Sequence, residues 1–224
     1  MSTYQVLGQT VTMPVLVRDA SAGTVIFDVD RVAAQALVPP VFEVIESSPG
    51  KAQLALVLID YRDNDLGAYH EVGTIFFVRP VGGGADGTYI SHLPVDQEFT
   101  CAAGNQIWGF PKTVEEIKVT PTPSTSRWVL RMDGELVLDI TVPRGGHDVL
   151  PEMSLISYTL RDGTPCATAF AQGGTGSSMS FEGLTWELGT HPIAKELESL
   201  GLSFVMASWI EHMQARFEDA IALA

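Results

Sequence analysis

Stretches in which hydrophobic and polar residues alternate run along most of the chain, and this period of two predicts β-strands. Segments rich in Gly, Asp and Pro, such as "DASAG" (19–23) and "VGGGADG" (81–87), separate the stretches and predict turns. The strands we expect are residues 10–18, 23–29, 52–62, 68–80, 88–95, 115–122, 126–133, 135–142, 153–161, 166–172, 178–188 and 203–210. The pattern predicts hairpins about "DASAG", about "DG" at 133–134 and about "DGTP" at 162–165.

Helix signals are fewer, and each covers a short segment. They are residues 30–38 with Asp30 as N-cap, 97–104 with Asp96 as N-cap, 190–200 with Thr190 as cap and Pro192 in the first turn, and the tail beyond Ile210. No repeat or long linker interrupts the chain, which predicts a single domain over residues 1–224. We expect an α+β fold built on a mainly antiparallel, barrel-like sheet of the double-psi or cone type, with short helices at its ends.

The composition excludes several classes of partner. Hydrophobic residues make up 46% and charged residues 18% of the chain, as in ordered globular proteins, and the net charge is −14. A charge of this sign repels phosphate backbones and anionic membranes, so we expect neither nucleic acid nor a membrane as partner. No apolar run is long enough to cross a bilayer, and the first residues lack the features of a signal peptide, which favours a cytoplasmic location. We therefore expect Cys101 and Cys166 to be free thiols.

Several familiar binding motifs are incomplete. "GGTGSS" (173–178) lacks the ending of a phosphate-binding P-loop, and "GGGADG" (82–87) joins two predicted strands with no helix after it. The histidines follow neither an HxH nor an HExxH spacing, and no GxSxG sequence is present. We expect no metal and no cofactor.

Lys112 is the residue that best fits a catalytic role. It is one of four lysines, and it directly follows Trp108, Phe110 and Pro111 in "QIWGFPKT". An amine attacks a carbonyl only when it is unprotonated, and burial disfavours the ammonium form. An apolar wall of Trp108 and Phe110 would supply such burial and contact a bound substrate, although a lysine after Pro also commonly extends into water.

Longer segments around this lysine resemble the acetoacetate decarboxylase family. "DQEFTCAAGNQIWGFPK" (96–112) is similar to the segment that ends in the family's Schiff-base lysine, and "LGAYHEVG" (66–73) resembles a motif that carries an acidic site residue. "LVRDASAGTVIFDVDRVAAQALVP" (16–39) is similar to the N-terminal part of the family, where an arginine precedes a turn. The resemblance covers nearly the whole chain.

By position, the resemblance implies that Lys112 forms an iminium with the substrate and that Glu71 faces it and moves protons. It also implies that Arg18 binds the substrate carboxylate. The activity implied is that of a Schiff-base lyase, a β-keto acid decarboxylase, acting on a small keto acid. The resemblance further implies a homo-oligomer and a reaction without cofactor.

The sequence departs from the family at two positions, and two other functions stay open. Thr113 stands where well-known members have a second lysine, and Leu56 stands where a second acidic residue is expected. We expect the pKa of Lys112 to fall below its ordinary value through burial and Arg18 alone.

The alternatives are an aldolase or dehydratase that uses the same lysine, and a non-catalytic barrel that binds a small ligand.

Overall fold

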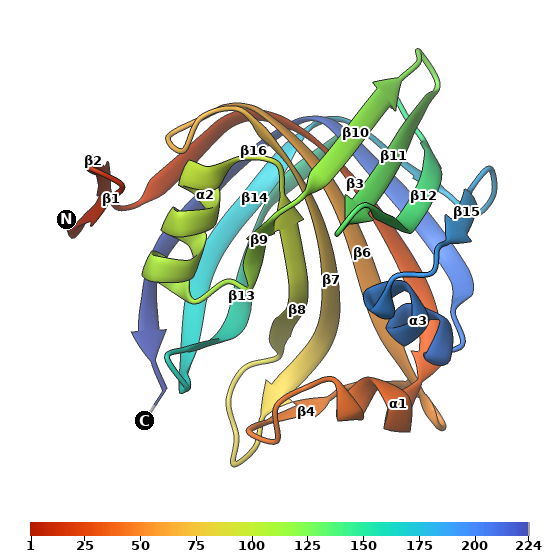
Figure 1. Ribbon diagram of the computed structural model, residues 1–224, viewed down its shortest axis with the longest axis horizontal. Helices are drawn as coiled ribbons and strands as arrows, with labels where there is room; N and C mark the ends of the chain where they lie inside the picture. The colour runs from red at the N-terminus through yellow and green to blue at the C-terminus, as the bar shows by residue number, and fades with distance from the viewer. Residues whose placement is uncertain (224) are drawn as a thin grey trace.

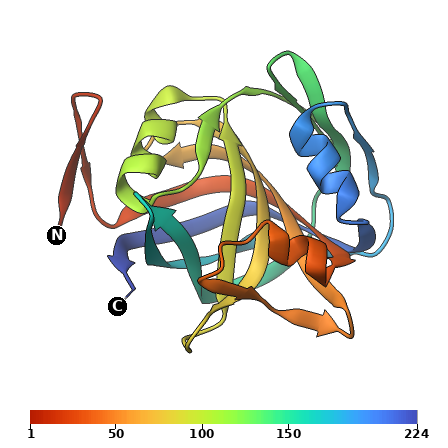
Figure 2. The same cartoon turned by 60° about the horizontal axis from the view of Figure 1, so that its bottom comes forward.

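A closed barrel of seven strands forms the centre of the molecule (Figures 1 and 2). The computed structural model describes residues 1–223. The barrel strands are β3 (Val15–Asp30), β6 (Lys51–Asn64), β7 (Tyr69–Pro80), β8 (Gly87–Val95), β13 (Asp148–Arg161), β14 (Thr164–Ser180) and β16 (Ser203–Ala222). Their order is β7-β6-β3-β16-β14-β13-β8, and β8 pairs again with β7, which closes the sheet. All neighbours are antiparallel except β8 and β13, which are parallel. The expected antiparallel, barrel-like fold class is confirmed.

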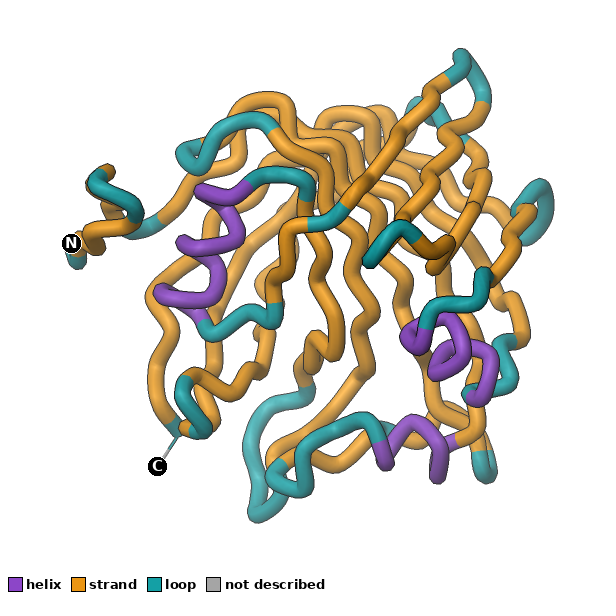
Figure 3. The backbone as a smooth tube through the Cα atoms, viewed as in Figure 1, coloured by secondary structure: helices purple, strands orange, loops and turns teal. Residues whose placement is uncertain are grey.

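A second sheet and the smaller elements surround the barrel. The second sheet has the order β10-β11-β12-β15 and lies beside β6 and α3 in Figure 1. The remaining elements are β1 (Thr3–Val6), β2 (Gln9–Thr12), α1 (Arg31–Ala36), β4 (Phe42–Val44), β5 (Glu46–Ser48), α2 (Glu98–Ala103), the π-helical turn η1 (Gly104–Trp108), β9 (Lys112–Val114), β10 (Glu116–Pro121), β11 (Thr125–Met132), β12 (Glu135–Pro143), β15 (Thr185–Leu188) and α3 (Pro192–Ser199). Figure 3 shows how far strands outnumber helices. No helix in the described residues is long and apolar enough to cross a membrane.

The barrel wall separates two hydrophobic cores. Leu56 and Leu58 on β6 pack with Trp128 of the second sheet in the first core, on one face of the wall. Tyr61 and Ile107 belong to the second core. Because successive side chains of a strand point to opposite faces, both faces of β6 are buried. The strand therefore carries a nearly continuous apolar run.

Several local predictions are confirmed. Asp30 caps α1 by accepting a hydrogen bond from the backbone nitrogen of Ala33 at 2.9 Å. The turn at 133–134 has positive φ angles at Asp133 and Gly134, as a tight hairpin turn requires. Both cysteines are free.

Two helix caps lie one residue later than predicted. Gln97 caps α2 in place of Asp96, whose carboxylate accepts from the backbone nitrogen of His70 at 2.7 Å. His191 caps α3 in place of Thr190. The helices predicted at 30–38, 97–104 and 190–200 are present as α1, α2 and α3.

Several predictions of secondary structure are wrong, and pairing with neighbouring strands explains two of them. "DASAG" is no turn, because β3 continues through it between β6 and β16. The tail beyond Ile210 is no helix, because β16 continues to Ala222, paired with β14 along this length and with β3 as far as Phe217. Paired backbone on both edges outweighs the weak local preference of these alanine-rich segments. The single strand expected at 178–188 is two pieces, the end of β14 and β15, which belong to different sheets.

Candidate active site

A cavity of about 250 Å³ lies inside the barrel, and the alternation of the strands determines its lining. On β6 the inward residues are Val57, Ile59 and Tyr61, and on β7 they include Tyr69 and Glu71. Most of the other lining residues are apolar. Within the described residues, Lys112 supplies the only ammonium in the lining and Glu71 the only carboxylate. The cavity is therefore an apolar chamber with a single pair of opposite charges.

The backbone of Lys112 is fixed by the turn that precedes it. After η1, Gly109 adopts a left-handed conformation with φ of 69°, and the chain then enters β9 at Lys112. The Asn105 side chain accepts a hydrogen bond from the Lys112 backbone nitrogen at 2.9 Å and donates one to the Lys112 carbonyl at 3.1 Å. Both backbone polar groups of Lys112 are thus bound by one amide, which directs the side chain into the barrel.

Three acceptors surround the Lys112 amine. Its Nζ lies 2.8 Å from Oε2 of Glu71 and donates to Oγ1 of Thr100 at 3.0 Å and to the Tyr69 hydroxyl at 3.3 Å. The Tyr61 hydroxyl donates to Oε1 of Glu71 at 3.2 Å, and the two tyrosine rings stack with centroids 4.4 Å apart. The Lys112 and Glu71 side chains are 4% and 6% exposed, so the pair is shielded from bulk water.

The electrostatics of this pair correct the expected direction of the Lys112 pKa. Burial lowers the pKa of Lys112, but the charge of Glu71, together with Tyr69 and the hydrogen bonds to both, outweighs burial and raises it above its ordinary value. Burial also raises the pKa of Tyr61 and Tyr69. Without a ligand the site therefore holds an ammonium–carboxylate pair, and the amine becomes nucleophilic only after it gives up a proton.

Gly104 allows the Lys112 side chain to reach this position. A Cβ atom at Gly104 would lie 2.6 Å from Cδ and 2.9 Å from Cε of Lys112. Contacts this short require a shift, and the stem of Lys112 has little freedom because both its backbone and its Nζ are bound. Only glycine leaves room for the lysine side chain here.

We expect Gly104→Ala to move the amine and to destabilise the protein by about 1–3 kcal/mol, as overpacked cores are. Without such a clash, a change from Gly to Ala inside a helix would stabilise the protein by about 1 kcal/mol. Urea unfolding of Gly104→Ala, Lys112→Ala and the double variant would measure the coupling between the two positions. Additive effects in this cycle would contradict the proposed clash.

The structure places three of the predicted site residues together with Lys112. Glu71 faces the amine, and Trp108 and Phe110 line the cavity with their rings stacked at 5.4 Å between centroids. The indole nitrogen of Trp108 donates to the Glu218 carbonyl at 2.8 Å, which fixes the ring against β16.

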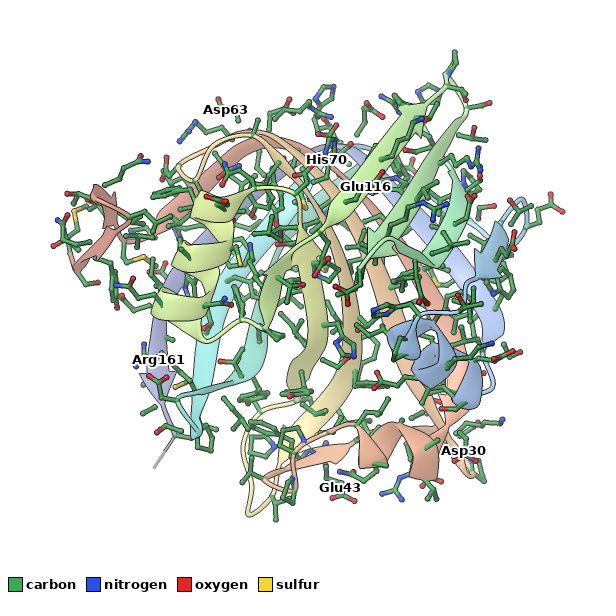
Figure 4. All side chains as sticks on the ribbon, in the orientation of Figure 1. Asp30, Glu43, Asp63, His70, Glu116 and Arg161 are labelled. Atoms are coloured by element: carbon green, nitrogen blue, oxygen red, sulfur yellow. The ribbon has the colours of Figure 1, made fainter. Side chains whose placement is uncertain are left out.

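Arg18 does not lie in the cavity. Val15 and Val17 of the same strand point inward, so alternation turns Arg18 to the outside. Its guanidinium pairs with Asp63 at 2.8 Å and Asp65 at 2.6 Å and is 46% exposed. Figure 4 shows the labelled Asp63 at the outer rim of the barrel. In this geometry Arg18 contacts neither Lys112 nor a ligand bound beside it, contrary to the expectation.

The two departures from the family pattern also lie away from the amine. Leu56 belongs to the core on the other face of β6, so it leaves no vacant carboxylate position in the cavity. Thr113 is exposed, on the side of β9 opposite to Lys112. Neither residue sets the charge around the lysine.

Sequence reasoning missed four polar residues of the site: Tyr61, Tyr69, Thr100 and Asn105. Tyr69 and Glu71 are two residues apart in "LGAYHEVG", so on one strand they share a face, and this signal could have found Tyr69. Thr100 and Asn105 lie within "EFTCAAGNQ", where their roles depend on how α2 and η1 return to β9.

No candidate metal centre accompanies the pair. Within the described part of the chain, no group of three or more His, Cys, Asp or Glu side chains is arranged to hold a metal ion. The titratable groups that line the cavity in the described residues are one amine, one carboxylate and two phenols.

Comparison with known protein families finds one matching family model. Residues 3–157 match the family model described as "Acetoacetate decarboxylase (ADC)". No curated protein shows significant sequence similarity to the chain.

Three solved structures illustrate the similarity of fold. One, described as "Structural Studies of Acetoacetate Decarboxylase", has a TM-score of 0.72 and 19% identity and covers 95% of this chain and 90% of its own. Acetoacetate decarboxylase from Legionella pneumophila has a TM-score of 0.71 and 20% identity, over 94% of this chain and 87% of its own. The enduracididine biosynthesis enzyme MppR complexed with pyruvate has a TM-score of 0.61 and 14% identity, over 96% of this chain and 91% of its own. At these identities the structures establish a shared fold.

Proposed function

The chain belongs to the acetoacetate decarboxylase family, and on that premise we propose that it is a lyase that forms a Schiff base between Lys112 and a β-keto acid and releases carbon dioxide. One observation carries the proposal: the Lys112 amine, buried inside an apolar cavity, lies 2.8 Å from a single carboxylate. No cofactor is needed for this chemistry, because the iminium itself accepts the electron pair.

The first step is a proton transfer within the pair. Passing one proton from Lys112 to Glu71 converts an ion pair into a neutral amine and a neutral acid, which an apolar cavity closed by a ligand favours. The free amine attacks the keto carbon, and the carbinolamine loses water as the Glu71 acid protonates the leaving hydroxyl. Thr100 and Tyr69 keep the nitrogen aimed at the cavity while its charge changes.

The second step is carbon–carbon bond cleavage. The bond between the α-carbon and the carboxylate breaks, its electron pair moves into the iminium, and carbon dioxide leaves an enamine. Glu71, now a carboxylate, takes up a proton from water and passes it to the α-carbon, which converts the enamine back to an iminium. Water then hydrolyses this iminium to the ketone and free Lys112. The apolar walls assist because they disfavour the carboxylate relative to neutral carbon dioxide.

An aldolase or dehydratase using the same iminium is the second candidate. The observation that favours it is the similarity of fold to a protein whose structure contains bound pyruvate. The two candidates differ in whether the carboxylate is lost, which one experiment can decide.

We expect sodium borohydride, added together with acetoacetate, to attach a reduced adduct to the peptide that contains Lys112. A decarboxylase would leave an isopropyl group on the amine, whereas an enzyme that keeps the carboxylate would leave the carboxylated adduct. Peptide mass spectrometry distinguishes the two. Lys51, Lys118 and Lys195 are exposed and serve as controls within the same chain. Labelling of those lysines without labelling of Lys112 would reject the Schiff-base mechanism.

A further inference from the structure

The cavity extends well beyond the lysine. Glu71 and Phe77 on β7 both line it, and they are six residues apart on a strand that rises about 3.3 Å per residue. The lining therefore follows β7 for roughly 20 Å. On β8, Leu93 lies beside Lys112, and Thr88 lies beside Phe77 at the far end.

The volume agrees with a ligand larger than acetoacetate. A dry protein cavity of about 150 Å³ accommodates benzene. On that scale, the 250 Å³ here would accommodate about ten non-hydrogen atoms, more than acetoacetate contains.

The far part of the cavity is mainly apolar and carries no charge in the described residues. Its walls are Ile75, Phe77, Ile90, Leu155 and Phe170. No second cation lines it in the described residues, so a carboxylate there would be buried and unpaired. A chain of methylene groups fits these walls, and a charged end does not.

Ser157 adds one polar requirement at that end. It lies in register with Thr88 on the neighbouring strand, lines the cavity and is 3% exposed. Its hydroxyl has no hydrogen-bond partner within the described structure. Thr88 donates to the Ile156 carbonyl at 3.3 Å, so its hydroxyl hydrogen is already used. Buried hydroxyls are normally paired, and an atom of a bound ligand is one partner that the cavity can supply.

We propose that the substrate is a medium-chain keto acid whose apolar tail lies along β7 and β8 and carries a neutral polar atom, a hydroxyl or a carbonyl oxygen, at Ser157. The assignment of the tail rests on the proposed function, because Lys112 fixes the position of the carbonyl. It narrows the substrate class from small keto acids to longer ones with an uncharged end.

Alcohols test this without any Schiff-base chemistry, because they contain no carbonyl. Binding of 2-propanol, 2-pentanol, 2-heptanol and a heptanediol with a second hydroxyl at the far end can be followed by calorimetry. We expect affinity to rise about fourfold per added methylene up to the length of the cavity. The diol should bind about 2- to 10-fold more tightly than 2-heptanol, the worth of one buried hydrogen bond.

Variants at Ser157 locate the effect. Ser157→Ala should remove the preference for the diol, and Ser157→Leu should weaken 2-heptanol while leaving 2-propanol unchanged. Ser154→Ala and Ser154→Leu are matched controls, because Ser154 is exposed on the same strand. If Ser157→Leu does not fold, the wild-type length series and Ser157→Ala still decide.

Affinity independent of chain length, or equal effects at Ser154 and Ser157, would overturn the proposal even if Lys112 forms its adduct. Conversely, a length dependence without any borohydride adduct would retain the tail site and reject the lyase. The two failures are therefore distinguishable.

Discussion

Replacing Lys112 with methionine is expected to abolish the borohydride adduct and to reduce decarboxylation to the background rate. The thioether has nearly the length of the lysine stem but offers no nucleophile, and no other lysine lines the cavity in the described residues. The change should also destabilise the fold by about 3–5 kcal/mol at neutral pH, because Glu71 would remain buried without its partner at 2.8 Å. Carbon dioxide release and urea unfolding measure the two effects.

A second substitution separates the loss of the nucleophile from the loss of the pair. Lys112→Met combined with Glu71→Gln removes both charges, and we expect most of the stability to return while activity stays absent. Lys118→Met, at an exposed lysine, should change neither property. Equal stability of the single and double variants would mean that Glu71 is solvated, which contradicts its 6% exposure.

The fold class and the central pair could be predicted because their signals are local. Lys112 follows a distinctive apolar segment, and Glu71 is a lone acid within a mostly apolar stretch. Alternation alone could not show which face of β7 points inward, because both faces are buried: Val72 belongs to one core and Tyr69 to the other. The resemblance to a family decided that direction for Glu71.

What could not be predicted depends on long-range pairing. The segment "DASAG" looks like a turn locally, but β6 and β16 hold it extended. The resemblance implied that Arg18 binds the substrate carboxylate, but the continuous strand directs Val15 and Val17 into the cavity and Arg18 away from it. Its actual partners, Asp63 and Asp65, lie about 45 residues further along the chain.

The sequence could not show whether the pKa of Lys112 is raised or lowered, because two opposing effects on it must be compared in size. Burial lowers the pKa of a lysine and a neighbouring carboxylate raises it, so the net direction depends on the distance between the amine and the carboxylate. At 2.8 Å the carboxylate prevails and the pKa is raised. A lysine whose pKa is raised on folding stabilises the folded state when the pH is below 10.5, the ordinary lysine pKa. This contribution is lost only as the pH rises through the folded-state pKa. The pair therefore supports the fold throughout the neutral range.

Replacing Glu71 with glutamine is expected to reverse the pKa shift and to slow catalysis. Without the carboxylate, burial becomes the dominant influence, so the pKa of Lys112 should fall below its ordinary value. The amine would then react with dinitrophenyl acetate at lower pH than in the wild type. Turnover should nevertheless fall by about 10²–10⁴, because the group that accepts and returns the proton is gone.

Tyr61→Phe provides the matched control for this reversal. It removes the donor that contacts Oε1 of Glu71 at 3.2 Å but keeps the carboxylate beside Lys112. We therefore expect the Tyr61→Phe labelling midpoint to stay above that of Glu71→Gln, and its turnover to fall far less.

If Glu71→Gln left the midpoint unchanged, the ammonium would owe its stability to Tyr69 and Thr100 alone. If turnover were also unchanged, proton transfer would have to proceed through the Tyr69 hydroxyl, 3.3 Å from the amine. A more reactive amine in a slower enzyme is thus the combined result that assigns proton transfer to Glu71.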